Sequence, residues 1–192
     1  MIISKTFVNS FSKVLELQPP TSGLLFFSVL YRSDLFSEEL IHRKIESLYG
    51  KLITFNPEFN PLASYYSKEM GSVETLKRFF LVTTSSYPRE FLLSTKLLSL
   101  DWERQWSDGN KRMVNVDLGL ISAENFILAT TKNYSHRIFL GQNIFADLTY
   151  QYQDTSYQTL PWTYPDFKDQ AKIEFLNWCR TFLLMHSKID SP

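Results

Sequence analysis

The sequence of 192 residues predicts an α+β protein with a ferredoxin-like split β-α-β-β-α-β core, followed by an extension of a helix, a β-hairpin and a last helix. Three observations predict this class. Apolar runs of strand length alternate with helical spacings over residues 23–118, a Gly-Gln-Asn turn joins two further strand-like runs, and no segment recurs at a fixed period. We expect an N-terminal arm over residues 1–22 and one α+β domain over 23–192, in which 119–192 pack on the core formed by 23–118.

The first half of the core is predicted as strand, helix, strand. Residues 24–31 are short and almost continuously apolar, which is typical of a strand in the centre of a sheet. Ser33 and Asp34 offer N-cap oxygens to the next helix, and Gly50 ends it. Residues 51–55 follow as a second strand. The apolar residues of the predicted helix recur at helical spacing: Ile41, Ile45, Leu48 and Tyr49.

The second half of the core has the same predicted order. A polar and aromatic connection over residues 60–71 leads to a strand over 77–83 and, after Pro88, to a second helix. One face of that helix carries Phe91, Thr95, Leu98 and Trp102. Residues 112–118 alternate as a strand with one polar face, which places Val114, Val116 and Leu118 on one side and Met113, Asn115 and Asp117 on the other.

The extension is predicted to begin with a helix that Ser122 caps and that runs to about Thr130. Residues 136–140 and 144–152 then form a hairpin around a loop at 141–143. This register sets Leu140 opposite Ile144 and Arg137 opposite Asp147. Asp166 caps the last helix, on which three residues share a buried face: Leu176, Cys179 and Leu183. We expect Cys179 to be a small buried hydrophobe.

Composition excludes several classes of protein. Lys and Arg total 20 and Asp and Glu total 20, so the net charge is zero, which argues against a generic nucleic-acid or anionic-membrane binder. The start lacks the basic head of a signal peptide, and no apolar run is long enough to span a bilayer, so we expect a cytoplasmic protein. One Cys excludes an intramolecular disulfide.

Common catalytic and cofactor motifs are missing. The chain has no phosphate-loop, dinucleotide-binding or Gly-x-Ser-x-Gly motif. Residues 110–113 start like a guanine-reading motif but have Met113 where a carboxylate belongs. The three His residues are far apart and none has a His or Cys at metal-ligand spacing, so we expect no metal site. The residues indicate no cofactor and no oligomeric state, and they leave open whether the protein is an enzyme.

Polar residues concentrate on the open face of the fourth strand and in the extension: Arg112, Asn115, Asp117, Lys132, His136, Arg137 and Asp147. Asn115 and Asp117 are two apart on a strand, so they share a face and can act jointly on a hydroxyl, an amine or a cation, or bond to the covering hairpin. Lys132 either satisfies the end of the predicted helix or joins His136 and Arg137 around a phosphate or carboxylate. Arg137 and Asp147 can instead form only a hairpin clamp.

Catalysis would depend on a residue that titrates near neutral pH. His136 is the general acid or base candidate in this group if Asp117 or Asp147 orients its ring. A hydrogen-bonded structural His is the alternative. The connection over residues 65–70 has the length to close over such a site, with Tyr66 and Glu69 as its polar contributors.

Four segments resemble a known family: 65–71 (YYSKEMG), 111–119 (KRMVNVDLG), 128–141 (LATTKNYSHRIFLG) and 160–166 (LPWTYPD). The chain is similar over about residues 14–186 to the uncharacterised prokaryotic domain-of-unknown-function family 4416. The resemblance implies a hypothetical protein, and some members carry a GTP-binding label that the missing guanine motifs do not support. It also implies recurrent polar positions: Tyr66, Glu69, Glu103, Arg112, Asn115, Asp117, Lys132, His136 and Arg137. The chain departs from the family pattern at Leu118, Leu120 and Asp147.

Three functions follow from these residues. The first is binding of a small anionic ligand, a nucleotide or phosphorylated metabolite, in which Lys132 and Arg137 hold the anion and Asn115 and Asp117 contact polar groups. The second is a non-catalytic interaction module whose polar cluster is a folding network. RNA binding through the sheet is the third and weakest, because the central strand lacks exposed aromatic and basic residues.

Overall fold

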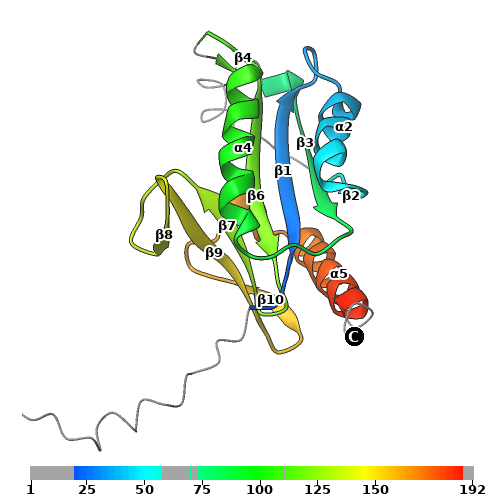
Figure 1. The fold of residues 1–192 in the computed structure, drawn as a ribbon, viewed down its shortest axis with the longest axis vertical. Coiled ribbons are helices and arrows are strands. Elements are labelled where there is room, and N and C mark those ends of the chain that lie inside the picture. The colour runs from blue at the N-terminus through cyan, green and yellow to red at the C-terminus, as the bar shows by residue number, and fades with distance from the viewer. Residues whose placement is uncertain (1–19, 58–69, 71–72, 110, 188–192) are drawn as a thin grey trace, which may run out of the picture.

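The computed structural model describes residues 20–57, 70, 73–109 and 111–187. Within them it shows an antiparallel sheet and helices, the α+β class that the sequence predicts (Figure 1). The strands are β1 (Leu24–Arg32), β2 (Leu52–Phe55), β3 (Leu76–Thr83), β4 (Ser107–Asp108), β5 (Lys111–Arg112), β6 (Val114–Ile121), β7 (Asn125–Thr130), β8 (Arg137–Gly141), β9 (Ile144–Gln153) and β10 (Ser156–Thr159). The helices are α2 (Glu38–Tyr49), α4 (Phe91–Gln105) and α5 (Gln170–Ser187), with short 3-10 turns at Val73–Thr75 and Pro165–Phe167.

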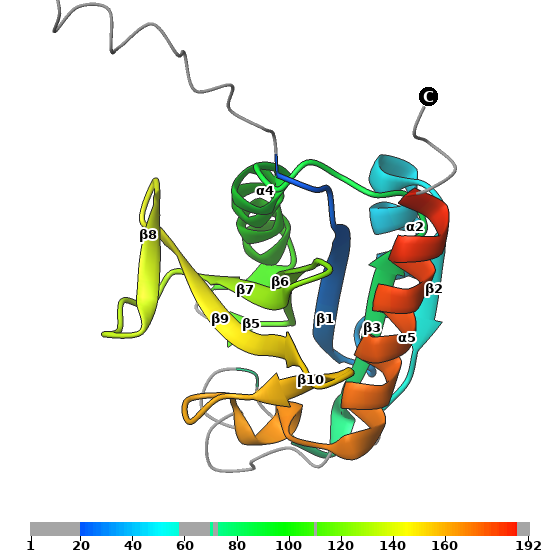
Figure 2. The same ribbon diagram turned by 90° about the horizontal axis from the view of Figure 1, so that it is seen from below.

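The strand order in the main sheet is β10-β9-β7-β6-β1-β3-β2, and β8 pairs with β9. β1 lies in the centre between β3 and β6, and every pairing is antiparallel. The nearly continuous apolar sequence of β1 is explained by this position, because both of its faces are covered. In Figure 2 the β8–β9 hairpin is on the left and α5 is on the right, where α5 covers one face of the sheet.

Two apolar cores lie on the two faces of the sheet. On one face, Phe27 and Val29 of β1 pack with Ile41 and Ile45 of α2 and with Trp102 of α4. On the other face, a second core gathers aromatic residues from β1, β3 and β7 against α5: Phe26, Phe80, Phe126, Phe167, Leu176, Cys179 and Leu183. The predicted buried face of the last helix is thereby confirmed, and Cys179 is a buried free thiol whose pKa is raised by burial.

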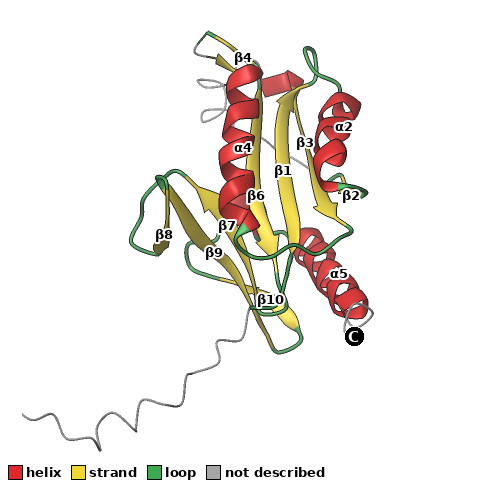
Figure 3. Cartoon of the chain, viewed as in Figure 1, coloured by secondary structure: helices red, strands yellow, loops and turns green. Residues whose placement is uncertain are grey.

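The prediction of a helix over residues 122–130 is wrong, because residues Asn125–Thr130 form the strand β7 (Figure 3). Ser122 Oγ accepts hydrogen bonds from the backbone N–H groups of Glu124 and Asn125, as an N-cap would, but these bonds close the turn between β6 and β7. The edge of β6 then pairs with residues 126–129, and Phe126 packs closely against Gly119. The Ser122 bonds are compatible with a helix start or with a β-turn, and the pairing of β7 with β6 selects the turn and the strand.

The predicted helix caps also need correction. Ser37, and neither Ser33 nor Asp34, caps α2, since Ser33 donates to the Thr75 carbonyl and Asp34 pairs with Arg32. Asp169 replaces Asp166 as the cap of α5, because its Oδ1 accepts from the Ala171 and Lys172 amides. Two residues expected on buried helix faces, Leu48 and Phe91, are exposed. Among the helices of the described residues, none is both long and apolar enough to cross a membrane.

The hairpin register is confirmed at one pair and wrong at the other. Arg137 lies opposite Asp147 as expected. Gly141, and not Leu140, lies opposite Ile144, because the loop holds only Gln142 and Asn143, whose φ angles are 49° and 61°. A register shift between Phe139 and Gly141 compensates for the shorter loop, and the Arg137 pairing is therefore retained.

Candidate functional site

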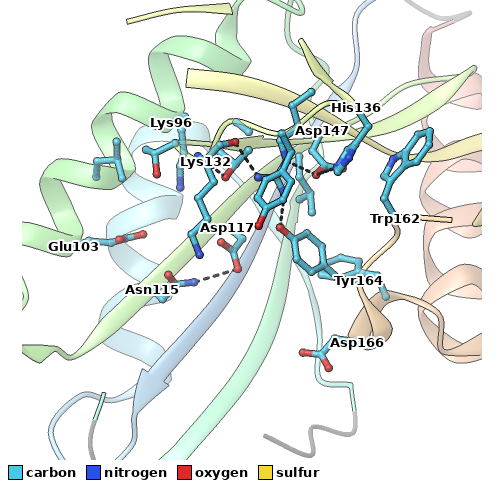
Figure 4. Close-up of a pocket in the computed structure, with 18 of the residues that line it drawn as sticks. Lys96, Glu103, Asn115, Asp117, Lys132, His136, Asp147, Trp162, Tyr164 and Asp166 are labelled. Atoms are coloured by element: carbon cyan, nitrogen blue, oxygen red, sulfur yellow. Dashed lines mark hydrogen bonds and ion pairs between the residues drawn. The ribbon is translucent and has the colours of Figure 1, made fainter. Parts of the chain in front are cut away.

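A cavity of about 540 Å³ lies between the first half of β6, the chain from Thr130 to Arg137 and the segment 162–167 (Figure 4). Eight of the predicted polar residues line it: Glu103, Arg112, Asn115, Asp117, Lys132, His136, Arg137 and Asp147. Two others, Tyr66 and Glu69, lie outside the described residues. The structure thus brings together residues from α4, β5, β6, β8, β9 and the connection that follows β7.

The cavity exists because β7 separates from β6. Leu118 lies opposite Ala129, and the same register would set Val116 opposite Thr131, but β7 ends at Thr130. Two side chains of α4 hydrogen-bond to the backbone amide and carbonyl of Val116, which strand pairing would otherwise satisfy. Lys96 Nζ donates to the Val116 carbonyl at 2.9 Å, and the Val116 amide donates to Glu103 Oε1 at 2.8 Å. A buried strand edge would otherwise leave two backbone groups without partners.

Lys96 and Glu103 are both buried, and the sequence indicated a structural partner for neither. Burial raises the pKa of Glu103, an effect that the charge of Lys96 and the bond from Val116 partly oppose. Because each side chain is fixed to the backbone of β6, the two hold the strand in place beside the cavity. They act as a substitute for the missing strand pairing.

A chain of hydrogen bonds runs along the polar face of β6. The Arg112 guanidinium lies 3.4 Å from Glu103 Oε2 and donates to Asn115 Oδ1 at 2.7 Å. Asn115 Nδ2 in turn donates to Asp117 Oδ2 at 3.1 Å. These bonds fix the orientation of the Asn115 amide, so that its second N–H and the Asp117 carboxylate remain for other partners. The alternation predicted for this strand is confirmed, with Val114, Val116 and Leu118 on the buried side.

Arg137 forms a buried clamp. Its Nε donates to Asp147 Oδ2 at 2.8 Å, its Nη1 to the carbonyl of Lys132 at 2.8 Å and its Nη2 to the Tyr164 hydroxyl at 2.5 Å. The side chains of Arg137 and Asp147 are only 4% and 2% exposed. Each guanidinium nitrogen thus contacts a protein oxygen, which favours the clamp interpretation of this pair and fixes the backbone that carries Lys132.

His136 is oriented by Asp147, one of the two carboxylates considered for this role. Its Nε2 lies 3.3 Å from Asp147 Oδ2, the same oxygen that Arg137 contacts. The ring stacks on Trp162 at 4.9 Å between centroids, and the Tyr134 ring lies 6.0 Å away with its plane inclined by 29°. These contacts give the imidazole a defined position in the cavity wall.

Sequence reasoning missed several residues of the cavity wall. Arg78 of β3 pairs with Asp166 at 2.7 Å, and Tyr164 and Trp162 come from the crossing segment that follows β10. Burial raises the pKa of Tyr164, which the nearby charge of Arg137 opposes. The signal for Arg78 in the sequence was its place as a charged residue directly before the apolar run of the third strand. The partners of these residues are distant in the sequence, so spacing could not identify them.

The charges around the cavity nearly balance. The described residues contribute five cationic side chains and four carboxylates to its wall, and His136 in addition. Three of the cations, those of Arg78, Arg112 and Arg137, each contact one of the carboxylates within 4 Å. In the described part of the chain, no group of three or more His, Cys, Asp or Glu residues is arranged to hold a metal ion.

Comparison with known proteins identifies the family. A family model, described as a domain of unknown function (DUF4416), matches residues 21–182. Searches of curated proteins and of solved structures found no match. The matched range contains the whole sheet, α2, α4 and all eight predicted cavity residues, which agrees with the family resemblance inferred from the four sequence segments. The chain therefore belongs to the DUF4416 family.

Proposed function

We propose that the protein binds a small anionic ligand, a nucleotide or phosphorylated metabolite, in the cavity beside β6. The observation that carries this proposal is the convergence of Lys132, Asn115 and Asp117 on one cavity (Figure 4). Its volume of about 540 Å³ lies in the usual range of small-molecule sites. Lys132 supplies an exposed cation, and its backbone carbonyl is held by Arg137.

The residues of the cavity take different roles in this proposal. Lys132 contacts the anion, whereas Arg137 positions the Lys132 backbone through the clamp with Asp147. Arg112, Glu103 and Asn115 keep Asp117 oriented. If chemistry follows binding, His136 is the acid–base candidate and Asp117 the second. Asp147 contacts Nε2, so Nδ1 of His136 is the nitrogen that would exchange a proton with the ligand.

The proposal also includes the ferredoxin-like topology, the cytoplasmic location and the partners expected from the sequence. The order β6-β1-β3-β2, with α2 and α4 packed against one face, supports a ferredoxin-like core. The zero net charge supports a protein without nucleic-acid or anionic-membrane partners. The cytoplasmic location expected from the sequence is also part of this proposal.

A second function, that of a non-catalytic interaction module, is favoured by β8. This edge strand exposes Ile138 by 69% and Phe139 by 60%, and among the described strands it pairs only with β9. Exposed apolar edge strands are templates for pairing with another chain. In this alternative the polar cluster of Arg137 and Asp147 serves to fix the hairpin.

A thermal-shift screen distinguishes the two functions. Purified protein is heated with nucleotides, sugar phosphates, carboxylates and divalent metals, together with the variants Lys132→Ala and Lys44→Ala. A compound at a hundred times its dissociation constant stabilises by about 2.7 kcal/mol, which for this size raises Tm by roughly 5–10 °C. We expect this shift in the wild type and in Lys44→Ala, an exposed lysine on α2, and its loss in Lys132→Ala. Absence of any shift across the panel would favour the interaction module.

A further inference from the structure

We propose that the ligand is a monophosphate with vicinal hydroxyl groups, and that Asn115 and Asp117 recognise those hydroxyls. This inference rests on the proposed function and narrows its ligand class. It excludes nucleoside di- and triphosphates as the preferred ligands. Three features of the cavity carry it: the donors and acceptors on β6, the balance of charges and the place of Lys132.

The first feature is an oriented amide next to a carboxylate. Asn115 uses Oδ1 to accept from Arg112 and one Nδ2 hydrogen to donate to Asp117. Asp117 is partly buried, and within the described residues it forms no ion pair. A carboxylate partly removed from water requires further donors. The pair therefore presents carboxylate acceptors and one N–H donor to the cavity.

A hydroxyl group matches this pair better than an ammonium group. A hydroxyl can donate to the Asp117 carboxylate and accept the remaining N–H of Asn115. An ammonium can only donate, so it would leave the Asn115 hydrogen without a partner. Two neighbouring hydroxyls can occupy both oxygens of the carboxylate while one of them accepts from the amide. Vicinal hydroxyls of a sugar have this arrangement.

The second feature is the near balance of charge. Among the five cations that the described residues contribute to the wall, those of Arg78, Arg112 and Arg137 face carboxylates, and Lys96 is bonded to the Val116 carbonyl. A triphosphate with about four negative charges would meet almost as many carboxylates as cations, and like charges in a partly buried site repel. A single phosphate needs much less positive potential. The wall therefore fits a monophosphate.

The third feature is the position of Lys132 relative to Asp117. Continuing the β6–β7 register would set Lys132 opposite Asn115, and Figure 4 shows its side chain extending toward Asn115 and Asp117. A phosphate bound by Lys132 would thus lie beside the hydroxyls bound by Asp117. The ligand must be compact, with both groups on one small scaffold.

Titration calorimetry with paired probes tests the inference. The probes are ribose 5-phosphate, 2-deoxyribose 5-phosphate, AMP, 2′-deoxy-AMP, ATP and inorganic phosphate. We expect ribose 5-phosphate or AMP to bind at least tenfold more tightly than its deoxy partner, and ATP to bind no more tightly than AMP. Inorganic phosphate should bind more weakly than either sugar monophosphate, because it makes only the Lys132 contact.

Two variants assign the preference to Asp117. In Asp117→Asn the ratio between ribose and deoxyribose probes should fall to within about threefold, whereas Asp101→Asn, at an exposed residue of α4, should retain the wild-type ratio. Circular dichroism checks that both variants fold. If Asp117→Asn does not fold, the wild-type ratios decide alone.

Each other outcome refutes a separate statement. Equal binding of deoxy and ribose probes, or ATP binding tenfold more tightly than AMP, would overturn this inference and leave anion binding intact. If none of the phosphate probes binds, the inference fails, and binding of another carboxylate or phosphate in the thermal-shift screen would show that the proposed function survives without it.

Discussion

Removal of the Arg137 guanidinium should destabilise the whole domain. In Arg137→Met the long aliphatic stem remains, but the bonds to Asp147, the Lys132 carbonyl and Tyr164 are lost. Asp147, only 2% exposed, then becomes a buried carboxylate with no guanidinium beside it. Removing one partner of such a buried pair costs about 3–5 kcal/mol. For a chain of this length that corresponds to a decrease in Tm of roughly 6–20 °C.

Most of this cost should come from the carboxylate that is left behind. The double variant Arg137→Met/Asp147→Leu removes both charges, so its unfolding free energy should exceed that of Arg137→Met alone. Arg104→Met is the matched control. Arg104 also pairs with a carboxylate, that of Asp101 at 2.6 Å, but its side chain is 74% exposed, and exposed pairs contribute about 0–1 kcal/mol.

Urea denaturation followed by circular dichroism measures all of these variants under the same conditions. If Arg137→Met differs from the wild type by no more than Arg104→Met, the buried clamp does not stabilise the domain. If the double variant is no more stable than Arg137→Met, the carboxylate left behind is not the main source of the cost. Either result would refute the reasoning from burial.

Other predictions concern single positions. Ser28 Oγ is buried on β1 without a hydrogen-bond partner among the described residues, so Ser28→Ala should leave urea stability unchanged or raise it by about 1 kcal/mol; a loss above that value would contradict this. Burial raises the pKa of Glu103, so the folded state binds this proton more tightly than the unfolded chain. The unfolding free energy should therefore decline as pH rises from the unfolded-state pKa of this carboxyl through its higher folded-state pKa. Glu103→Gln should abolish the decline, and an unchanged profile of urea stability against pH in this variant would refute the prediction. In Gly119→Ala the added Cβ would lie 2.8 Å from the Phe126 ring, and calorimetry should show a loss of about 1–3 kcal/mol rather than a neutral effect.

The local sequence pattern was sufficient to predict strands whose apolar residues form a continuous run or alternate regularly with polar ones. The apolar run of β1 predicted a central strand and the alternation in β6 predicted a strand with one polar face, and the structure buries the expected residues of both. The same alternation placed Asn115 and Asp117 on one face, where they hydrogen-bond to each other. The predicted pairing of Arg137 with Asp147 is also confirmed, although the predicted loop was one residue too long and a register shift in β8 compensates for the difference. The family membership was also accessible from short motifs.

Tertiary structure decided the rest, because those features depend on partners distant in the sequence. Ser122 makes the bonds of a helix cap, yet the open edge of β6 makes residues 125–130 a strand. The cavity itself arises where β7 leaves β6 and Lys96 and Glu103 of α4 satisfy Val116, which no spacing in the sequence reveals. Periodicity determines which face of an element is buried, whereas the pairing of strand edges and buried charges is settled only when the elements pack.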